Sequence, residues 1–314
     1  MSVSKLYLDY AVKLHAATAQ SAAAVYVDGV RAASLNTGLR TMVEAGDGEV
    51  FGSFGSLVAG APVARFTSVD LAVVLAQVGF SGMLVNSDGS HPGVELYFRR
   101  MAQGGTRMSG SVNHKTTIAN GLAVLRRLSA RHQEAAEVEV EVYARSNDGA
   151  SPIVYDEAAA LPSHNAGPDA VWTVGPIDVD GTTLQGIESV EVDPGVQVVS
   201  EGRDSDVYPT FCSIRSVQPS IRVRTRHLDI TTSLTEDGLY KAAGEVIVYF
   251  RKRAEGGTFV ADATAEHISL TLGKCRIEPQ AVEGDPKTID LLITPWATIG
   301  TSAPIAVSTT AAIE

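Results

Sequence analysis

Apolar and polar residues alternate at every second position through much of the chain. The clearest run is VEVEVYA (138–144), and the runs IRVRTR (221–226) and EVIVYF (245–250) follow the same pattern. A period of two is typical of a β-strand that has one buried and one solvent-facing side. Clusters of Gly, Pro, Asn and Asp separate these runs, as turns do. The pattern therefore predicts a mainly β protein.

One phrase occurs twice. Residues 96–106 read LYFRRMAQGGT and residues 248–258 read VYFRKRAEGGT. Seven of the ten positions from Tyr97 to Thr106 are identical to those 152 residues later. A fixed offset over a long distance indicates that the chain contains a tandem duplication.

Further matches extend the repeat. The offset of 152 also relates Val27–Gly29 to Val179–Gly181, and Pro152 to Pro304. Between these anchors an offset of 157 relates Val50-Phe51 to Val207-Tyr208, Phe54 to Phe211, Pro62 to Pro219 and Leu71 to Leu228.

The two offsets require insertions, which loops tolerate well. We place five extra residues of the second copy in SEGRDSD (200–206) against EAGDGE (44–49). Five extra residues of the first copy are then placed in VGFSGMLVNSDGSHPG (78–93) against TEDGLYKAAG (235–244). All four segments are rich in turn-forming residues, which supports the alignment.

The repeat also decides an ambiguous segment. The apolar residues of TTIANGLAVLRRLSA (116–130) fit either a helix or a strand. The corresponding segment HISLTLGKCRIEP (267–279) alternates and contains Pro279, which a helix interior does not tolerate. We therefore predict strands in both copies.

One short helix is expected in each copy. TSVDLAVVLAQVG (67–79) has Thr67 or Ser68 as its N-cap, and Asp70 lies near the positive end of the helix dipole. TRHLDITTSL (225–234) is the shorter counterpart. The sequence thus predicts two tandem homologous domains, each a β-sandwich or barrel with one short flanking helix. Their predicted bounds are 1–160 and 171–314, with the linker LPSHNAGPDA at 161–170.

Composition limits the classes of function. Of the 314 residues 45% are hydrophobic and 19% are charged, which fits a globular protein. No apolar run reaches the ~20 residues that cross a bilayer, and no signal peptide is expected. Cys212 and Cys275 are too few for a disulfide framework and are expected to be buried thiols. No metal or cofactor is expected.

The net charge of −11 lies in the second half of the chain. Residues 1–152 carry 13 basic and 13 acidic groups, and residues 153–314 carry 12 and 23. No basic stripe suited to phosphates is present, so a nucleic-acid grip and a ring-shaped DNA clamp are both disfavoured.

Catalytic motifs are absent from the sequence, so an enzyme is not expected. Glu137, Glu139 and Glu141 share one face of a predicted strand, which is either a solvated face or an acidic wall along a cavity. Arg99 and Arg251 recur at equivalent positions, either as interface residues or as remnants of the duplication. The other candidates are expected in ordinary structural places: the histidines His91, His114, His132 and His267 on the surface or in loops, and Trp296 in the core.

The order of segments resembles the tube domain of the tail tube proteins of long-tailed bacteriophages. The resemblance in the first copy rests on VDG (27–29), GEVFGSFGSL (48–57), PVARFTSVDLAVVL (62–75), a strand ending in LYFRR, and HQEAAEVEVEVYARSNDGASPIV (132–154). In the second copy it rests on VDG (179–181), residues 205–230, VYFRKRAEGG (248–257) and IDLLITPWA (289–297).

This resemblance implies a structural virion protein of the phage tail, made in the host cytoplasm. Inner strands of neighbouring subunits would join into a barrel, and a fused pair of domains would form a trimeric, pseudo-hexameric ring. Stacked rings would conduct DNA without binding it specifically. The partners would be further copies of the chain and the terminator, tape measure and tip proteins, with no membrane and no cofactor.

The resemblance also suggests where rings would stack. Two long loops, 44–52 and 199–209, are the candidates, with these acidic residues: Glu44, Asp47, Glu49, Glu201, Asp204 and Asp206. The main alternative is a ring protein of the tail tip or baseplate built from the same domains. A tandem β-sandwich module that binds sugar or protein is the further alternative.

Overall fold

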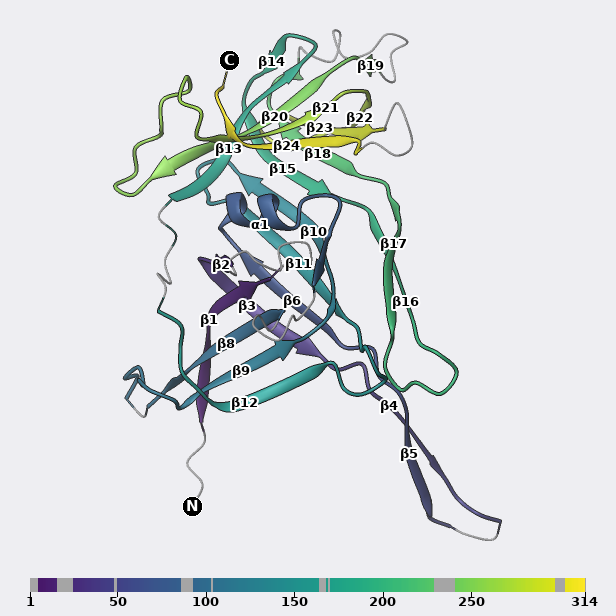
Figure 1. Cartoon of the computed structure of the whole chain (residues 1–314). Helices are drawn as coiled ribbons and strands as arrows, with labels where there is room; N and C mark the ends of the chain where they lie inside the picture. The colour runs from purple at the N-terminus through teal and green to yellow at the C-terminus, as the bar shows by residue number, and fades with distance from the viewer. Residues whose placement is uncertain are drawn as a thin grey trace.

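The computed structural model is mainly β, as the alternating pattern predicts. It describes residues 5–15, 25–47, 50–85, 93–102, 104–163, 168, 170–228, 241–296 and 303–313. Within these ranges all strand pairs are antiparallel and one α-helix is present, α1 (Leu71–Gln77) (Figure 1).

Two five-stranded sheets have the same strand order, one in each half of the chain. The order is β12-β9-β8-β1-β2 in the first half and β24-β21-β20-β13-β14 in the second. The strands are β1 (Leu6–Leu14), β2 (Val25–Val27), β8 (Val94–Met101), β9 (Asn113–Ile118), β12 (Ile153–Ala159), β13 (Ala170–Val179), β14 (Thr182–Leu184), β20 (Val246–Ala254), β21 (His267–Leu272) and β24 (Ile305–Ala311).

A ten-stranded sheet runs through both halves in the order β19-β22-β23-β18-β15-β10-β11-β6-β3, and β7 also pairs with β10. Its first-half strands are β3 (Val30–Asn36), β6 (Val63–Ser68), β7 (Met83–Val85), β10 (Gly121–Arg131) and β11 (Glu137–Ala144). Its second-half strands are β15 (Ile187–Asp193), β18 (Ser220–Thr225), β19 (Lys241–Ala243), β22 (Cys275–Glu283) and β23 (Thr288–Pro295).

A long two-stranded hairpin leaves each half. The first consists of β4 (Arg40–Glu44) and β5 (Phe54–Ala59), and the second of β16 (Val196–Glu201) and β17 (Phe211–Val217). Figure 1 shows that β4–β5 projects away from the body, on the side opposite the second half.

The two halves also share details of their pairing registers. In β10·β11 the register breaks between Leu125 and Arg127, and in β22·β23 it breaks at the equivalent point between Pro279 and Ala281. A β-bulge inserts one residue at a chosen place in a ladder, so the same bulge in two places is a detailed match. The boundary at 161–170 stays a prediction.

The repeated phrase forms the same turn in both halves. Met101 bridges Arg107 after β8, and Arg253 bridges Phe259 after β20. The turn needs two residues with positive φ, which glycine adopts without strain. The glycines are Gly104, Gly105, Gly256 and Gly257, with φ of 86°, 83°, 89° and 88°.

The register corrects one anchor of the sequence alignment. The Ser68 hydroxyl donates to the carbonyl of Asp28, and the Thr225 hydroxyl donates to the carbonyl of Gln185. The segment Val27–Gly29 therefore corresponds to Leu184–Gly186, at an offset of 157, and not to 179–181. The second Val-Asp-Gly is the β13–β14 turn, and its match to the first reflects the shared preference of turns for Asp and Gly.

The same register corrects the first insertion. Glu44 pairs with Phe54 and Glu201 pairs with Phe211, so the two hairpin tips have equal length. No residues are inserted there. The second insertion does lie where the alignment places it, because Val85 to Val94 is longer than the corresponding stretch from Ala243 to β20.

The helix α1 begins later than expected. Strand β6 continues to Ser68, so neither Thr67 nor Ser68 caps the helix. Asp70 is the N-cap, and its carboxylate accepts a hydrogen bond from the backbone N–H of Val73 (3.4 Å). The expected second helix falls largely on 229–234, outside the described residues, and Thr225 belongs to β18.

The core lies between the ten-stranded sheet and the two smaller sheets. One continuous cluster includes residues of both five-stranded sheets, such as Leu96 and Val248, and of the large sheet, such as Phe66 and Ile293. The buried face of α1 joins it through three residues, Leu71, Val74 and Leu75. The strands predicted at 116–130 and 267–279 are confirmed.

Candidate functional site

The two halves are joined edge to edge by β10 and β15. Leu128 pairs with Val192, and three further pairs follow, up to Arg131 with Ser189. The backbone N–H of His132 extends the ladder by donating to the carbonyl of Glu188 (2.8 Å). The junction therefore converts two five-stranded units into one sheet.

The two outer edges of this sheet are formed by the strands equivalent to β15 and β10, the two strands that meet at the junction. Strand β3 corresponds to β15, and among the described residues it pairs with β6 alone. Strand β22 corresponds to β10, and β19 covers only its first residues, Cys275–Ile277. Val282, on the uncovered part of β22, is 54% exposed. An uncovered strand edge offers backbone donors and acceptors to another chain.

The second hairpin adds a further contact between the halves. Val196 and Cys212 of β16–β17 pack against Leu122 and Val124 on β10, in a small cluster separate from the main core. The partly buried side chains around it are Tyr143, Val198, Ile214 and Val217. Two strands alone are marginally stable in water, so this apolar contact with β10 stabilises the hairpin.

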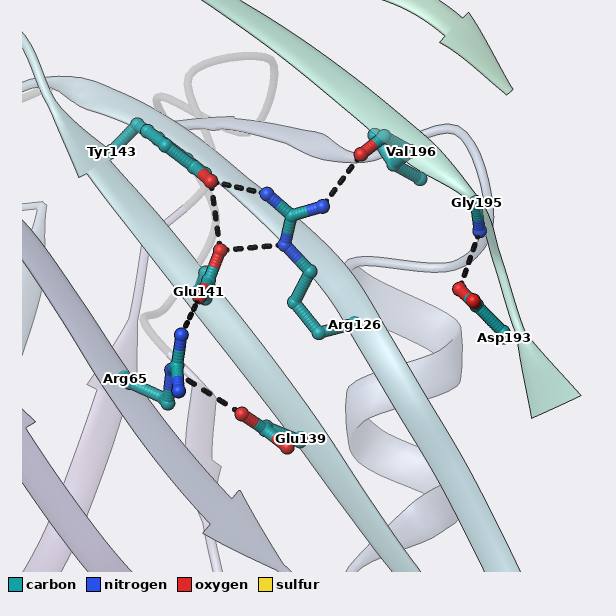
Figure 2. A network of polar contacts seen from close by, with 8 residues as sticks. All are labelled: Arg65, Arg126, Glu139, Glu141, Tyr143, Asp193, Gly195 and Val196. Carbon is teal, nitrogen blue, oxygen red and sulfur yellow. Dashed lines mark hydrogen bonds and ion pairs between the residues drawn. The ribbon is translucent and has the colours of Figure 1, made fainter. Parts of the chain in front are cut away.

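Arg126 fixes the hairpin to the sheet. Its side chain lies at the β10 bulge, and one terminal nitrogen donates to the carbonyl of Val196 (2.5 Å) (Figure 2). The Nε atom donates to Glu141 (2.5 Å), and the other terminal nitrogen contacts the hydroxyl of Tyr143. Arg65 approaches Glu141 from β6. One carboxylate thus organises side chains from three neighbouring strands.

The surroundings keep Glu141 ionised. Burial alone would raise the pKa of its carboxyl group. Hydrogen bonds from Tyr143, Arg126 and Arg65 together lower the pKa by more than burial raises it, so the net pKa lies below its ordinary value. Burial and the bond to Glu141 raise the pKa of Tyr143. The lowered pKa of Glu141 and the raised pKa of Tyr143 favour an ionised carboxylate beside a protonated phenol, as the ion pairs with Arg65 and Arg126 require.

The three predicted glutamates of β11 do share one face, but that face is not an acidic wall. Glu137 is paired with Arg31 (2.5 Å) and Glu139 with Arg65 (3.2 Å). Further ion pairs lie on the same sheet, between strands or along one strand: Arg127–Glu191, Arg224–Glu188, Arg224–Asp290, Arg226–Glu188 and Arg276–Glu278. The face carries interspersed charges of both signs. Whether it lines a channel stays a prediction.

The candidate stacking loops differ in their surroundings. Glu44 and Asp47 are exposed on the projecting hairpin, and Glu49 lies outside the described residues. Glu201 and Asp204 are also exposed, although their hairpin is seated on the first half. Half-buried Asp206 accepts a hydrogen bond from the backbone of Arg203 and shapes the tip. Ring stacking through these loops stays a prediction.

Arg99 and Arg251 occupy equivalent places. Arg99 lies opposite Leu8 in β1·β8, and Arg251 lies opposite Thr173 in β13·β20. Each guanidinium is close to an aromatic ring: Arg99 is 4.1 Å from the ring centre of Tyr10, and Arg251 is 5.7 Å from that of Phe259. Both are half-buried within their own half. An interface role stays a prediction.

Trp296 corrects an expectation from the sequence. Its side chain is 45% exposed, and it lines a cleft of about 800 Å³ at the base of the β16–β17 hairpin. The residue directly follows β23, so it lies beyond the alternation that places strand residues in the core. Core packing is therefore wrong for this residue.

The described part of the chain holds no group of three metal-ligating side chains. Among the described residues, no helix is both long and apolar enough to span a bilayer. Sequence reasoning missed Arg126, the β10·β15 junction and the cleft. The break in alternation at Arg126-Arg127 is the one signal that marks the bulge.

Neither a protein-family model nor a curated protein matches the chain.

Proposed function

We propose that the protein is a structural ring protein, and that three chains close into a ring with six similar units. The observation that carries this proposal is the β10·β15 junction. The equivalents of these two strands, β22 and β3, lie at the two outer ends of the same sheet, so the same pairing can form between chains. A head-to-tail contact between different edges closes into a ring when the rotation permits.

The internal junction predicts the register between chains. Leu128 corresponds to Val282 and Val192 corresponds to Leu35, so Val282 of one chain would lie opposite Leu35 of the next. Glu283 would lie opposite Ser34 in the same way. The exposure of Val282, an apolar residue on a strand edge, has a physical reason in this arrangement.

The place of such rings in a phage tail tube that conducts DNA is supported by the resemblance of the sequence. The face of the large sheet that points away from the core carries charges of both signs. Its arginines are neutralised by neighbouring carboxylates and so would not bind phosphates strongly, which suits a channel through which DNA passes without being bound. A ring protein of the tail tip would use the same contact. The number of copies per virion distinguishes these two positions.

The test is sedimentation and negative-stain microscopy of the purified chain over a range of concentrations. Rings built from three 33.0 kDa chains, or stacks of them, are expected. Val282→Asp places a charge in the predicted contact and is expected to give folded monomers. Val154→Asp, at a similarly exposed site (57%) on β12, is the matched control and should still form rings. A wild-type chain that stays monomeric at all concentrations would refute the proposal.

A further inference from the structure

We propose that the tip of the β4–β5 hairpin, at Val50 and Phe51, inserts into the cleft beside Trp296 of a second copy of the chain. This inference rests on the proposed ring and names the contact that holds neighbouring chains together besides the strand edges. It assigns this hairpin to a lateral contact within one ring instead of to stacking between rings.

The β4–β5 hairpin carries an unusual share of exposed apolar surface. Val50 and Phe51 at its tip are 88% and 84% exposed. Further large apolar residues along the hairpin are also exposed: Leu39, Met42, Val43, Phe54, Leu57 and Val58. A projecting two-stranded hairpin gains no stability from such residues in water, so the surface is suited to burial against a partner.

The β16–β17 hairpin shows the kind of surface on which such a tip docks. Its tip residues Val207 and Tyr208 correspond to Val50 and Phe51, and they are docked on the first half of the chain. The backbone N–H of Gly60 donates to the carbonyl of Val207 (2.8 Å). A Cβ atom added to Gly60 would lie 2.7 Å from the ring of Tyr208, so the ring rests directly on the base of β4–β5.

The two hairpins have equivalent geometry. The first leaves β3 by a turn in which Asn36 accepts from the backbone of Gly38 (3.0 Å), and the second leaves β15 by a turn in which Asp193 accepts from Gly195 (2.8 Å). Both then have a register shift one or two pairs along and tips of equal length. Two hairpins with the same exit and length deliver their tips to equivalent positions.

The position equivalent to the Tyr208 seat is the cleft beside Trp296. The first-half seat is built from the base of β4–β5 and the segment after β11, and the cleft is built from the base of β16–β17 and the segment after β23. Its lining residues include Ile214, Val217, Pro219, Pro295, Trp296 and Pro304. In a single chain nothing described fills this cleft, whereas the equivalent seat is occupied.

The cleft of the same chain is out of reach of the hairpin. Figure 1 shows the tip of β4–β5 and strand β23 at opposite ends of the molecule. The occupant must therefore come from another chain, and the head-to-tail arrangement places the first half of one chain beside the second half of the next.

The seam between chains is more polar than the seam within the chain. Arg276 and Glu278, which form an ion pair, replace the buried Leu122 and Val124 in the seat of the hairpin. This difference is expected, because the seam between chains is exposed to water until assembly, while the seam within one chain is always covered. The apolar anchor is then left to Phe51 and Trp296, consistent with the role of aromatic residues in interfaces.

Photo-crosslinking of assembled rings tests the contact. A photoreactive phenylalanine at position 51 is expected to crosslink to residues 214–220 or 294–296 of a different chain, identified by mixing isotope-labelled and unlabelled protein. The matched control carries the same group at Tyr155, which is 54% exposed and should give no crosslink to the cleft. Phe51→Ala should weaken ring formation at least about tenfold, as loss of one buried aromatic anchor does.

The outcomes separate this inference from the proposed function. Crosslinks to the cleft support the inference. Rings whose position 51 crosslinks elsewhere, or Phe51→Ala rings that form normally and fail only to stack, would overturn the inference and leave the ring intact. A wild-type chain that forms no rings and no crosslinks between chains overturns both. Tyr208→Ala is the internal reference, because it should loosen its hairpin in the monomer, whereas Phe51→Ala should leave the monomer unchanged.

Discussion

Asn113 and His267 occupy equivalent places in the two halves and make the same pair of contacts with different side chains. Asn113 accepts a hydrogen bond from the backbone N–H of Arg100, and His267 accepts one from that of Lys252, both at 3.0 Å. A side-chain nitrogen of each residue also faces a carbonyl of the preceding loop: Nδ2 of Asn113 donates to Gly110 (2.9 Å), and Nε2 of His267 lies 3.1 Å from the oxygen of Ala261. Since Nδ1 of His267 accepts, Nε2 carries the proton. Both residues are fully buried, and His267 begins strand β21, so the expected surface or loop position of His267 is wrong.

Removing either side chain should destabilise the half that contains it. Asn113→Ala and His267→Ala each leave a buried backbone N–H and a loop carbonyl without partners, which costs about 1–3 kcal/mol. Urea unfolding followed by tryptophan fluorescence measures the loss. His114→Ala, one residue along the same strand and half-buried, serves as the control and should change the free energy of unfolding less. Equal losses in all three variants would show that the shared contact has no special role.

The Glu141 network predicts a stability difference that depends on pH. Its folded-state pKa lies below the ordinary value of 4.5, so the ionised carboxylate stabilises the folded chain above that pH. As the pH falls through the folded-state pKa, the carboxylate becomes protonated and this contribution is lost. Glu141→Gln should therefore be less stable than the wild type at pH 7, by about 1–3 kcal/mol, and the gap should close in acid.

A matched carboxylate checks this second prediction. Glu157 is exposed on β12, and Glu157→Gln should leave the free energy of unfolding close to that of the wild type at neutral and acid pH. Thermal or urea unfolding at pH 7 and pH 3.5 provides the comparison. A gap between wild type and Glu141→Gln that stays constant over this range would exclude ionisation of Glu141 as its cause.

Local pattern was enough to predict most strands and the likeness of the two halves. The alternation in VEVEVYA survives as β11, because its valines face the core and its glutamates face out. The repeated Tyr-Phe-Arg phrase survives because its turn needs two glycines in both copies. Side-chain periodicity and turn chemistry are local properties, and a single sequence records them directly.

Relationships between distant segments were beyond the sequence. Spacing placed Glu137, Glu139 and Glu141 on one face, but their arginine partners come from β3, β6 and β10, and strand order is set by pairing that leaves no local trace. The false Val-Asp-Gly anchor arose for the related reason that turn residues recur wherever a turn is needed. The β10·β15 junction needs the full sheet order, so sequence alone could suggest a ring but not its contact.

The two cysteines give a last prediction about which part of the fold opens first. Burial raises the pKa of the Cys275 thiol, in the main core, to about 12. Burial also raises the pKa of the Cys212 thiol, which lies on β17 and packs against β10. Both thiols should react only slowly with a thiol reagent at pH 8 in the native chain, and rapidly in urea. During slow native labelling Cys212 should react first, since its hairpin can lift without opening the core.

Tyr208→Ala should accelerate labelling of Cys212 and not of Cys275. The single variants Cys212→Ser and Cys275→Ser assign the two rates, and equal acceleration of both thiols would mean that the hairpin does not open separately from the core.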